Sequence, residues 1–376
     1  MPTFIESGLH IDVAQFGIVL GAFLVGAGLF QIPAGLAAVR WGSRRVSLAA
    51  LAVMGVFAVA SGFAPNWYVL IALRFGVGAG AAMFFAPALG LVASYFPAGS
   101  RGPVIGLYNA GFSVGAAAGL FVGALIGAAL GWGWALGLGG VALLIAAGAA
   151  AVVLPDLGIP QQLRTFREVL ATSRPVLRSR PVWALAIAIT GLWAAFFIVA
   201  QFFVAFAADV HPSWPLALAV SLPTVMIAIE IVGGPIGGIL GERVRDIRVP
   251  LAIAGAMSGV AVLLIPFLPL GALLALFVLL GFVEGIVFAV LYLLPSYFPG
   301  IQGEGFALSL ALINGIQILA GSALAVAFGF LAADAGYTVA WLFAGAISLL
   351  GLPLLVLVPR ARGAGRTASE ASPADD

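Results

Sequence analysis

The chain has 376 residues, of which 63% are hydrophobic and only 8% charged, and its mean hydropathy is +1.20. Soluble domains carry about 25% charged residues, so this composition predicts an integral membrane protein. All 16 basic residues are arginine, no cysteine is present, and there are two histidines. A lysine-dependent ATP-binding loop, Schiff-base chemistry and thiolate metal sites are therefore excluded, and haem or zinc is poorly supported. We expect no metal, no cofactor and no enzymatic activity.

Apolar runs of about 20 residues can cross a bilayer as helices, and they predict an all-α membrane fold. Eleven spans are expected, at 14–38, 46–63, 67–93, 103–130, 132–154, 181–208, 215–240, 249–268, 270–297, 305–331 and 337–358. We divide the chain into an N-terminal bundle of five spans (1–154), a cytoplasmic linker with a possible short surface helix (155–180), a six-helix bundle (181–358) and a disordered cytoplasmic tail (359–376).

The arginines fall in alternate connections between the spans. They are Arg40, Arg44 and Arg45; Arg101; the stretch from Arg164 to Arg180; Arg243, Arg245 and Arg248; and the tail from Arg360 to Arg366. The opposite connections carry Glu6, Asp12, Asp209 and Asp334 instead. The positive-inside rule places the arginine loops and the C-terminus in the cytoplasm, and residue 1 outside. The stretch GLAAVRWGSRR (35–45) is then a cytoplasmic clamp between two helices of a plasma-membrane protein.

The two halves repeat. SYFP occurs at 94–97 and again at 296–299, and Arg40 and Arg243 occupy similar helix-end positions at nearly the same offset. This pattern is typical of transporter halves related about the membrane normal. The repeat predicts one more helix, ending near residue 6. Either the native start lies upstream of Met1, which we favour, or the protein lacks that helix.

Several motifs resemble those of the major facilitator superfamily of secondary transporters. The loop after the family's second helix is matched by Gly35, Arg40, Gly42, Arg44 and Arg45, with Val39 in place of the family's Asp, and again by Gly238, Glu242 and Arg243. Leu70, Arg74, Gly78, Gly80 and Ala82 resemble the fourth-helix pattern, in which the arginine is often linked to proton coupling. Gly115, Gly119 and Gly123 resemble the antiporter motif, but Leu120 replaces its proline, which weakens an export assignment.

The resemblance implies a two-bundle fold of twelve spans, about eleven of them in this chain. It also implies alternating access about a midplane site, with the loop motifs forming a cytoplasmic gate.

Three ionisable residues lie within predicted spans: Arg74, Glu230 and Glu284. A charge at the centre of a spanning helix costs about 2.5 to 3.5 kcal/mol on insertion scales, so such groups usually face a cavity, a partner or a proton path. We take them as candidates for coupling or substrate contact. The alternatives are structural: a carboxyl that fixes helix packing, or an arginine that caps carbonyls or pairs with an acid.

Neutral polar side chains are cheaper to bury, and interhelical hydrogen bonding is their default role. The candidates for lining a cavity are Gln31, Asn109, Gln201, Asn314 and Gln317. Trp193 is a candidate for stacking on a ligand, with lipid-facing packing as its alternative. His10 and His211 lie in predicted outer loops, where we expect solvated or capping roles.

These features predict a secondary active transporter that moves a small solute by alternating access, coupled to protons, with a small organic or inorganic anion suggested by Arg74. One alternative is proton-driven efflux of amphipathic or cationic compounds, which two buried acids and many aromatic residues would suit. An alternative of another class is a non-transporting receptor or assembly subunit. The expected partners are the solute, protons and the lipid bilayer. We expect a monomer and no nucleic acid.

Overall fold

The structure is a computed structural model that describes residues 2–95, 101–155, 168, 174–298 and 304–360. Within these residues the chain is built from helices without strands. Ten helices are long and apolar enough to cross a membrane, and Val13–Leu29 is a shorter apolar helix. The prediction of an all-α membrane fold with about eleven apolar helices is confirmed.

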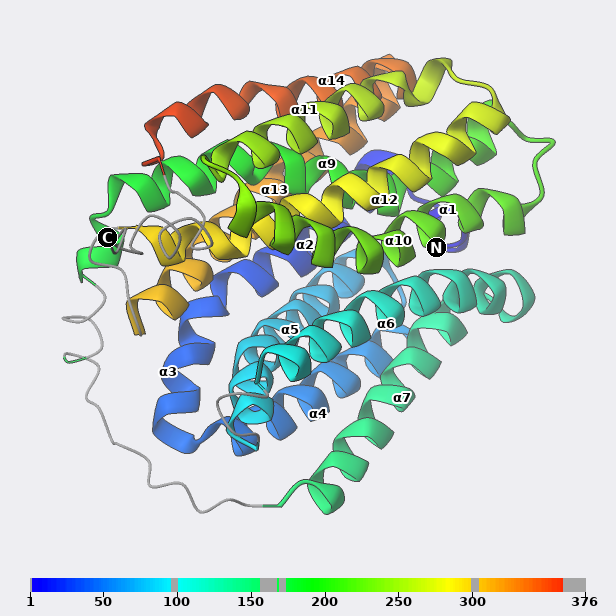
Figure 1. The fold of residues 1–376 in the computed structure, drawn as a ribbon. Coiled ribbons are helices and arrows are strands. Elements are labelled where there is room, and N and C mark those ends of the chain that lie inside the picture. The colour runs from blue at the N-terminus through cyan, green and yellow to red at the C-terminus, as the bar shows by residue number, and fades with distance from the viewer. Residues whose placement is uncertain (1, 96–100, 156–167, 169–173, 299–303, 361–376) are drawn as a thin grey trace, which may run out of the picture.

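Figure 1 shows the helices, which we describe in two parts of the chain, before and after the linker. The first part holds α1 (Pro2–Leu9), α2 (Val13–Leu29), α3 (Gln31–Trp41), α4 (Ser43–Ser61), α5 (Trp67–Ser94), α6 (Arg101–Leu130) and α7 (Trp132–Val153). The second part holds α9 (Arg180–Val210), α10 (Leu216–Arg243), α11 (Arg248–Leu264), η2 (Ile265–Phe267), α12 (Leu270–Leu293), η3 (Leu294–Tyr297), α13 (Glu304–Ala335), α14 (Tyr337–Leu350) and η4 (Leu352–Leu357).

Two features of the N-terminal region differ from the sequence prediction. Helix α1 is not among the eleven predicted spans, because its eight residues include Glu6 and Ser7 and make no long apolar run; only the sequence repeat indicated a helix that ends near residue 6. The span predicted over 14–38 is divided at Phe30 into α2 and α3. Pro33 has no N–H to donate to the carbonyl four residues earlier, which explains the interruption. The predicted surface helix in the linker and the tail beyond residue 360 lie largely outside the described residues.

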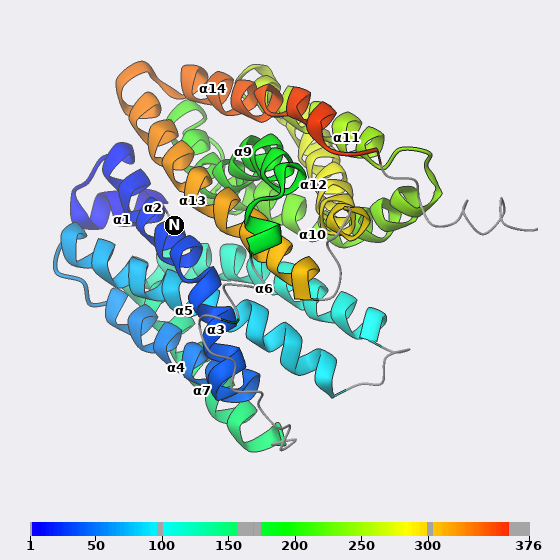
Figure 2. The same ribbon diagram turned by 90° about the vertical axis from the view of Figure 1, so that its left-hand side faces the viewer.

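Helices α2 to α7 and helices α9 to α14 meet along two helix pairs. Helix α2 packs on α13 as well as on α5, and α6 packs on α10 (Figure 2). Buried side chains from both parts share one hydrophobic cluster, in which the rings of Phe16 and Phe202 lie 5.7 Å apart. Helix α3 bends away from the direction of α2 and packs on α5 and α4, with a smaller contact to α13 (Figure 1). The two parts are therefore packed together at the end that carries α1, which is the predicted outer end.

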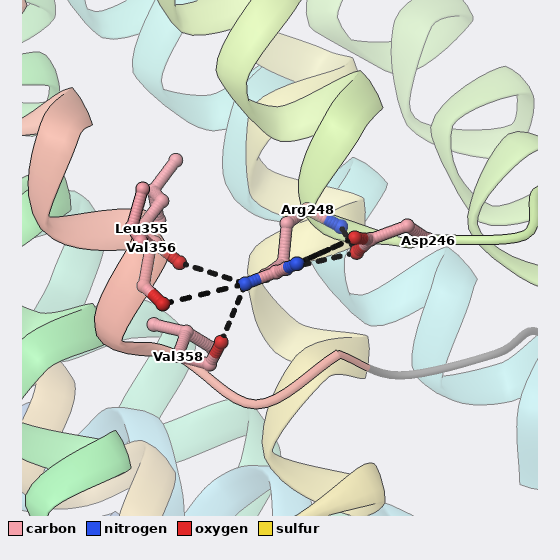
Figure 3. A network of polar contacts seen from close by, with 5 residues as sticks. All are labelled: Asp246, Arg248, Leu355, Val356 and Val358. Carbon is pink, nitrogen blue, oxygen red and sulfur yellow. Dashed lines mark hydrogen bonds and ion pairs between the residues drawn. The ribbon is translucent and has the colours of Figure 1, made fainter.

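Two arginines at the other end make equivalent contacts, which extends the sequence repeat into the structure. Arg44 donates to the carbonyls of Leu154 (3.0 Å) and Ala151 (2.8 Å) at the end of α7. Arg248 donates to the carbonyl of Val358 (2.8 Å), just after η4 (Figure 3). Both members of the second pair lie 204 positions after those of the first. The last carbonyls of a helix lack partners within it, so each arginine ties two helices together.

Close helix contacts form at several of the predicted glycines. A side chain at Gly78 would collide with the backbone carbonyl of Phe23 on α2, and one at Gly285 would lie 2.5 Å from the carbonyl oxygen of Glu230 on α10. At both positions the lack of a side chain lets the backbones of the two helices approach closely. By contrast, Cβ atoms at Gly115 and Gly119 on α6 would meet nothing within 4 Å.

Candidate functional site

Arg74 lies on α5, two turns from the start of the helix, with its side chain turned toward α4. Its Nε donates to the hydroxyl of Ser61 at 3.3 Å, and Ser61 donates in turn to the carbonyl of Phe57 at 2.7 Å. One terminal nitrogen, Nη2, is buried and has no hydrogen-bond partner in the described part of the chain. Arg74 is thus a cation removed from water, and it donates a hydrogen bond to a neutral hydroxyl. The interpretation of Arg74 as the partner of an acidic side chain gains no support from these contacts.

Glu284 lies within α12 and is 1% exposed. Its Oε1 accepts a hydrogen bond from the hydroxyl of Ser258 on α11 at 2.5 Å, while Oε2 is buried without a partner among the described residues. The carboxyl is therefore enclosed by helices of the second part of the chain. An ionised carboxylate with an unpartnered oxygen is costly away from water, and a bound proton removes that cost.

Glu230 lies on α10, opposite Gly285 of α12, where the two backbones come into contact. Its carboxyl accepts a hydrogen bond from the side chain of Ser113 on α6, and it lies close enough to Glu284 for the two charges to repel. The other carboxyl oxygen, Oε1, is buried and has no partner in the described residues. The structure thus brings the two predicted intramembrane acids together.

The neutral polar candidates lie on four helices. Gln31 is buried at the start of α3 and Gln317 is buried on α13, whereas Gln201 on α9 and Asn314 on α13 are half-buried. Asn109 belongs to α6, but its side chain lies outside the described set. The burial of the two glutamines fits interhelical hydrogen bonding and leaves a role in ligand binding as a prediction.

Trp193 differs from its lipid-facing interpretation. Its ring stacks on Phe197 with centroids 5.3 Å apart and planes at 9°, and it fills the space above Gly321 on α13. The indole is half-buried and reaches α13 because that helix lacks a side chain at Gly321, a contact that the lipid-facing interpretation does not include. Because the ring of Phe197 covers one face of the indole, that face is not open to a ligand in this structure.

The histidines end helices at the predicted outer end. His10 follows α1 with a positive φ of 53°, and His211 follows α9 and stacks on Trp214 at 4.2 Å. The backbone amide of His211 bonds to the carbonyl of Ala207 at the end of α9, and a solvated or capping role for the two histidine side chains remains a prediction.

The loop motifs lie apart from the buried acids. Gly42 has a φ of 86° and forms the turn between α3 and α4, a conformation that favours glycine. Arg44 caps α7, while Arg45 and Arg243 are exposed. Gly35 and Gly238 have open space beside them, and the side chains of Arg40 and Glu242 lie outside the described set. The clamp predicted for residues 35–45 therefore also holds α7, and a gating role remains a prediction.

Sequence reasoning missed the hydroxyl partners of the site. Ser61, Ser113 and Ser258 each contact one of the three ionisable candidates from a neighbouring helix. Serine is common in membrane helices, and its spacing in one sequence carries no signal of which helix lies opposite. Among the described residues no cluster of three or more His, Cys, Asp or Glu side chains could hold a metal ion.

The chain belongs to the Major Facilitator Superfamily, whose family model matches residues 1–316. This confirms the family resemblance. It also makes the chain a multi-span integral membrane protein.

Three curated relatives are similar to parts of the chain. The 4-hydroxybenzoate transporter PcaK of Pseudomonas aeruginosa is 36% identical over 148 residues, which are 39% of this chain and 33% of that protein. The hexuronate transporter of Bacillus subtilis is 30% identical over 130 residues, 34% of this chain and 31% of that protein. The lincomycin resistance protein of Streptomyces lincolnensis is 37% identical over 90 residues, 24% of this chain and 18% of that protein. The matches span a third or less of each relative.

A solved structure shares the fold over most of the chain. The crystal structure of a bacterial homologue of the human lysosomal transporter Spinster, in an inward-facing and occupied conformation, superposes with a TM-score of 0.65. The match covers 94% of this chain and 89% of that one, at 17% sequence identity. At that identity the similarity establishes the fold alone.

Proposed function

We propose that this chain transports a small organic anion across the cell membrane and that a proton gradient drives the transport. Aromatic and sugar acids are the first substrates to test. The observation that supports this proposal most directly is Arg74. A buried guanidinium with a neutral partner and an unpartnered Nη2 is suited to a carboxylate, which it binds with charge-assisted hydrogen bonds. The relatives that transport 4-hydroxybenzoate and hexuronate point to the same chemistry.

Proton coupling is proposed from the two buried carboxyls, Glu230 and Glu284. Each has one hydroxyl partner and one oxygen without a partner in the described residues, so each is able to take up and release a proton as its surroundings change. The arginine-bearing loops and the C-terminus are proposed to lie in the cytoplasm. We propose a monomer surrounded by lipid, because the apolar exterior of the helices needs no second chain to face a bilayer.

The test is uptake of radiolabelled 4-hydroxybenzoate and glucuronate into proteoliposomes, with and without an inward proton gradient. Parent protein should accumulate at least one of them, and collapse of the gradient should stop the accumulation. Arg74→Gln should reduce uptake at least tenfold, because a hydrogen bond to a charged group is worth about 1.5 to 3 kcal/mol and 1.4 kcal/mol corresponds to a factor of ten.

Arg178→Gln is the matched control, since it removes an exposed arginine at the end of the linker. It should transport like the parent. Full uptake by Arg74→Gln, or none by well-folded parent protein for any acid in the panel, would contradict the proposal.

Efflux of an amphipathic cation is the second candidate, favoured by the paired acids Glu230 and Glu284 and by the similarity to the lincomycin resistance protein. The same proteoliposomes distinguish the two. Cation transport should fail chiefly in Glu284→Gln and survive in Arg74→Gln, the reverse of the pattern expected for an anion.

A further inference from the structure

The two buried acids differ in which part of the chain surrounds them. Glu284 on α12 bonds to Ser258 on α11, and both helices belong to the second part of the chain. Glu230 on α10 bonds instead to Ser113 on α6, across the junction with the first part. If the two parts rock against each other, the partner of Glu284 travels with it, whereas the partner of Glu230 does not.

The bond between Ser113 and Glu230 lies beside the packed part of the junction of α6 and α10. Toward the predicted outer end, Ala117 and Ala124 on α6 and Met226 on α10 are buried in the cluster shared by both parts. Close to the bond in sequence, Phe112 on α6 is 64% exposed and Val232 on α10 is 53% exposed. Labels at these two positions therefore report on the junction without replacing a buried side chain.

A group couples to a conformational change only if it interacts differently with the two conformations. Resting on the proton coupling proposed above, we infer that Glu230 is the residue whose proton binding is linked to movement of the two parts, through the hydrogen bond that Ser113 makes across their junction. Glu284 is a positioning residue: when it is ionised, its charge favours proton binding by Glu230 from within the same bundle.

The other charged groups on the helices around α10 lie near helix ends. Helix α12 contributes Glu284 alone. On α6 the neighbour is the neutral Ser113, and the hydroxyl of Tyr108 is bound to the carbonyl of Phe85. Helix α9 carries Arg180 and Asp209 at its two ends, and α11 begins with Arg248, which is paired with Asp246. The proton response should therefore depend on Glu230 and Glu284.

The experiment measures the distance between spin labels at Phe112→Cys on α6 and Val232→Cys on α10, one on each helix of the junction, between pH 5 and pH 9. The sequence has no native cysteine, so both labels attach only where they are placed. We expect the distance distribution to change with pH in the parent background. Glu230→Gln should abolish the change. Glu284→Gln should retain it with the midpoint moved to lower pH by about one unit, because a neighbouring negative charge is gone.

Ser113→Ala tests the bond itself and should weaken the pH response while keeping Glu230 titratable. Asp334→Asn, which alters an exposed acid on α13, is the matched control and should behave like the parent. Size-exclusion profiles and circular dichroism establish that each variant is folded, and Glu230→Asp replaces Glu230→Gln if the latter is not.

Loss of the response in Glu284→Gln with retention in Glu230→Gln would overturn the assignment, as would a parent distance that does not vary with pH. The readout needs no substrate. A pH-dependent distance in a protein that transports none of the acids would overturn the proposed substrate while supporting the role of Glu230.

Discussion

Glu6 is a half-buried acid on α1, outside the spanning helices, and it is placed to make stability depend on pH. Burial raises the pKa of Glu6 from 4.5 to about 7, and the negative charge of Asp12 adds to the effect. Its Oε1 has no hydrogen-bond partner among the described residues. Helix α1 packs on α9, α2 and α7, so Glu6 lies where both parts of the chain meet.

The folded state therefore holds a proton on Glu6 that the unfolded chain releases near pH 4.5. The stability that this proton contributes is complete below about pH 4.5 and is lost as the pH rises toward 7. We expect the midpoint of thermal unfolding in detergent to fall by about 2 to 4 °C over that interval.

Glu6→Gln should reduce that dependence, whereas Asp334→Asn should leave it as in the parent. A Glu6→Gln protein with the full pH dependence of the parent would show that another group is responsible.

At the scale of single residues the sequence located the ionisable members of the site but not their partners. Arg74, Glu230 and Glu284 stand out because charges are rare in apolar spans. Ser61, Ser113 and Ser258 do not, because which helix lies opposite depends on tertiary packing. The contact of Trp193 with α13 was missed for the same reason, since it depends on Gly321 on another helix.

At the scale of helices, the contacts of Arg248 bind the start of α11 to the end of η4. Asp246 accepts hydrogen bonds from Arg248, including one of 2.6 Å from Nη2, and these hold the pKa of Asp246 below its usual value. Gly42, at the position that corresponds to Asp246, gives Arg44 no such carboxylate. The second clamp is therefore the stronger of the two.

Arg248→Gln should lower the free energy of unfolding by about 1 to 3 kcal/mol, the range for charged hydrogen bonds at a partly exposed site. Arg44→Gln should lower it by less, and Arg178→Gln should have no effect. The stability of the three variants is compared by thermal unfolding or by titration with sodium dodecyl sulfate. An Arg44→Gln protein less stable than Arg248→Gln would contradict the ranking.

Helix positions were predicted well because the lengths and ends of apolar runs are set by the bilayer and by local signals such as proline and glycine. The same reasoning failed at Phe30, where a proline three residues later divides one apolar run into α2 and α3. Apolar length also missed α1, which is too short and too polar to register as a span, whereas the sequence repeat indicated a helix that ends near residue 6. Apolar length alone does not report a break within the membrane.

At the scale of the whole molecule, the junction of α2 and α13 holds the predicted outer end closed. Gly17 on α2 and Gly329 on α13 approach each other so closely that a Cβ on Gly17 would lie 3.5 Å from the Cα of Gly329. Alternating access requires this contact to open when the site faces the other side. A covalent link across it should therefore trap the protein as the structure shows it.

Gly17→Cys combined with Val326→Cys places two thiols within reach of a disulfide, because a Cβ on Gly17 would lie 3.6 Å from the Cα of Val326 on α13, and the chain has no other cysteine. Oxidation should stop uptake in proteoliposomes almost completely, and a reductant should restore it, because the bond prevents the separation of α2 from α13. Each single variant, treated with the same oxidant, controls for the substitutions themselves. Transport by the oxidised double variant at the rate of the reduced form would mean that the cycle proceeds without opening this end, and the alternating movement would have to lie elsewhere in the fold.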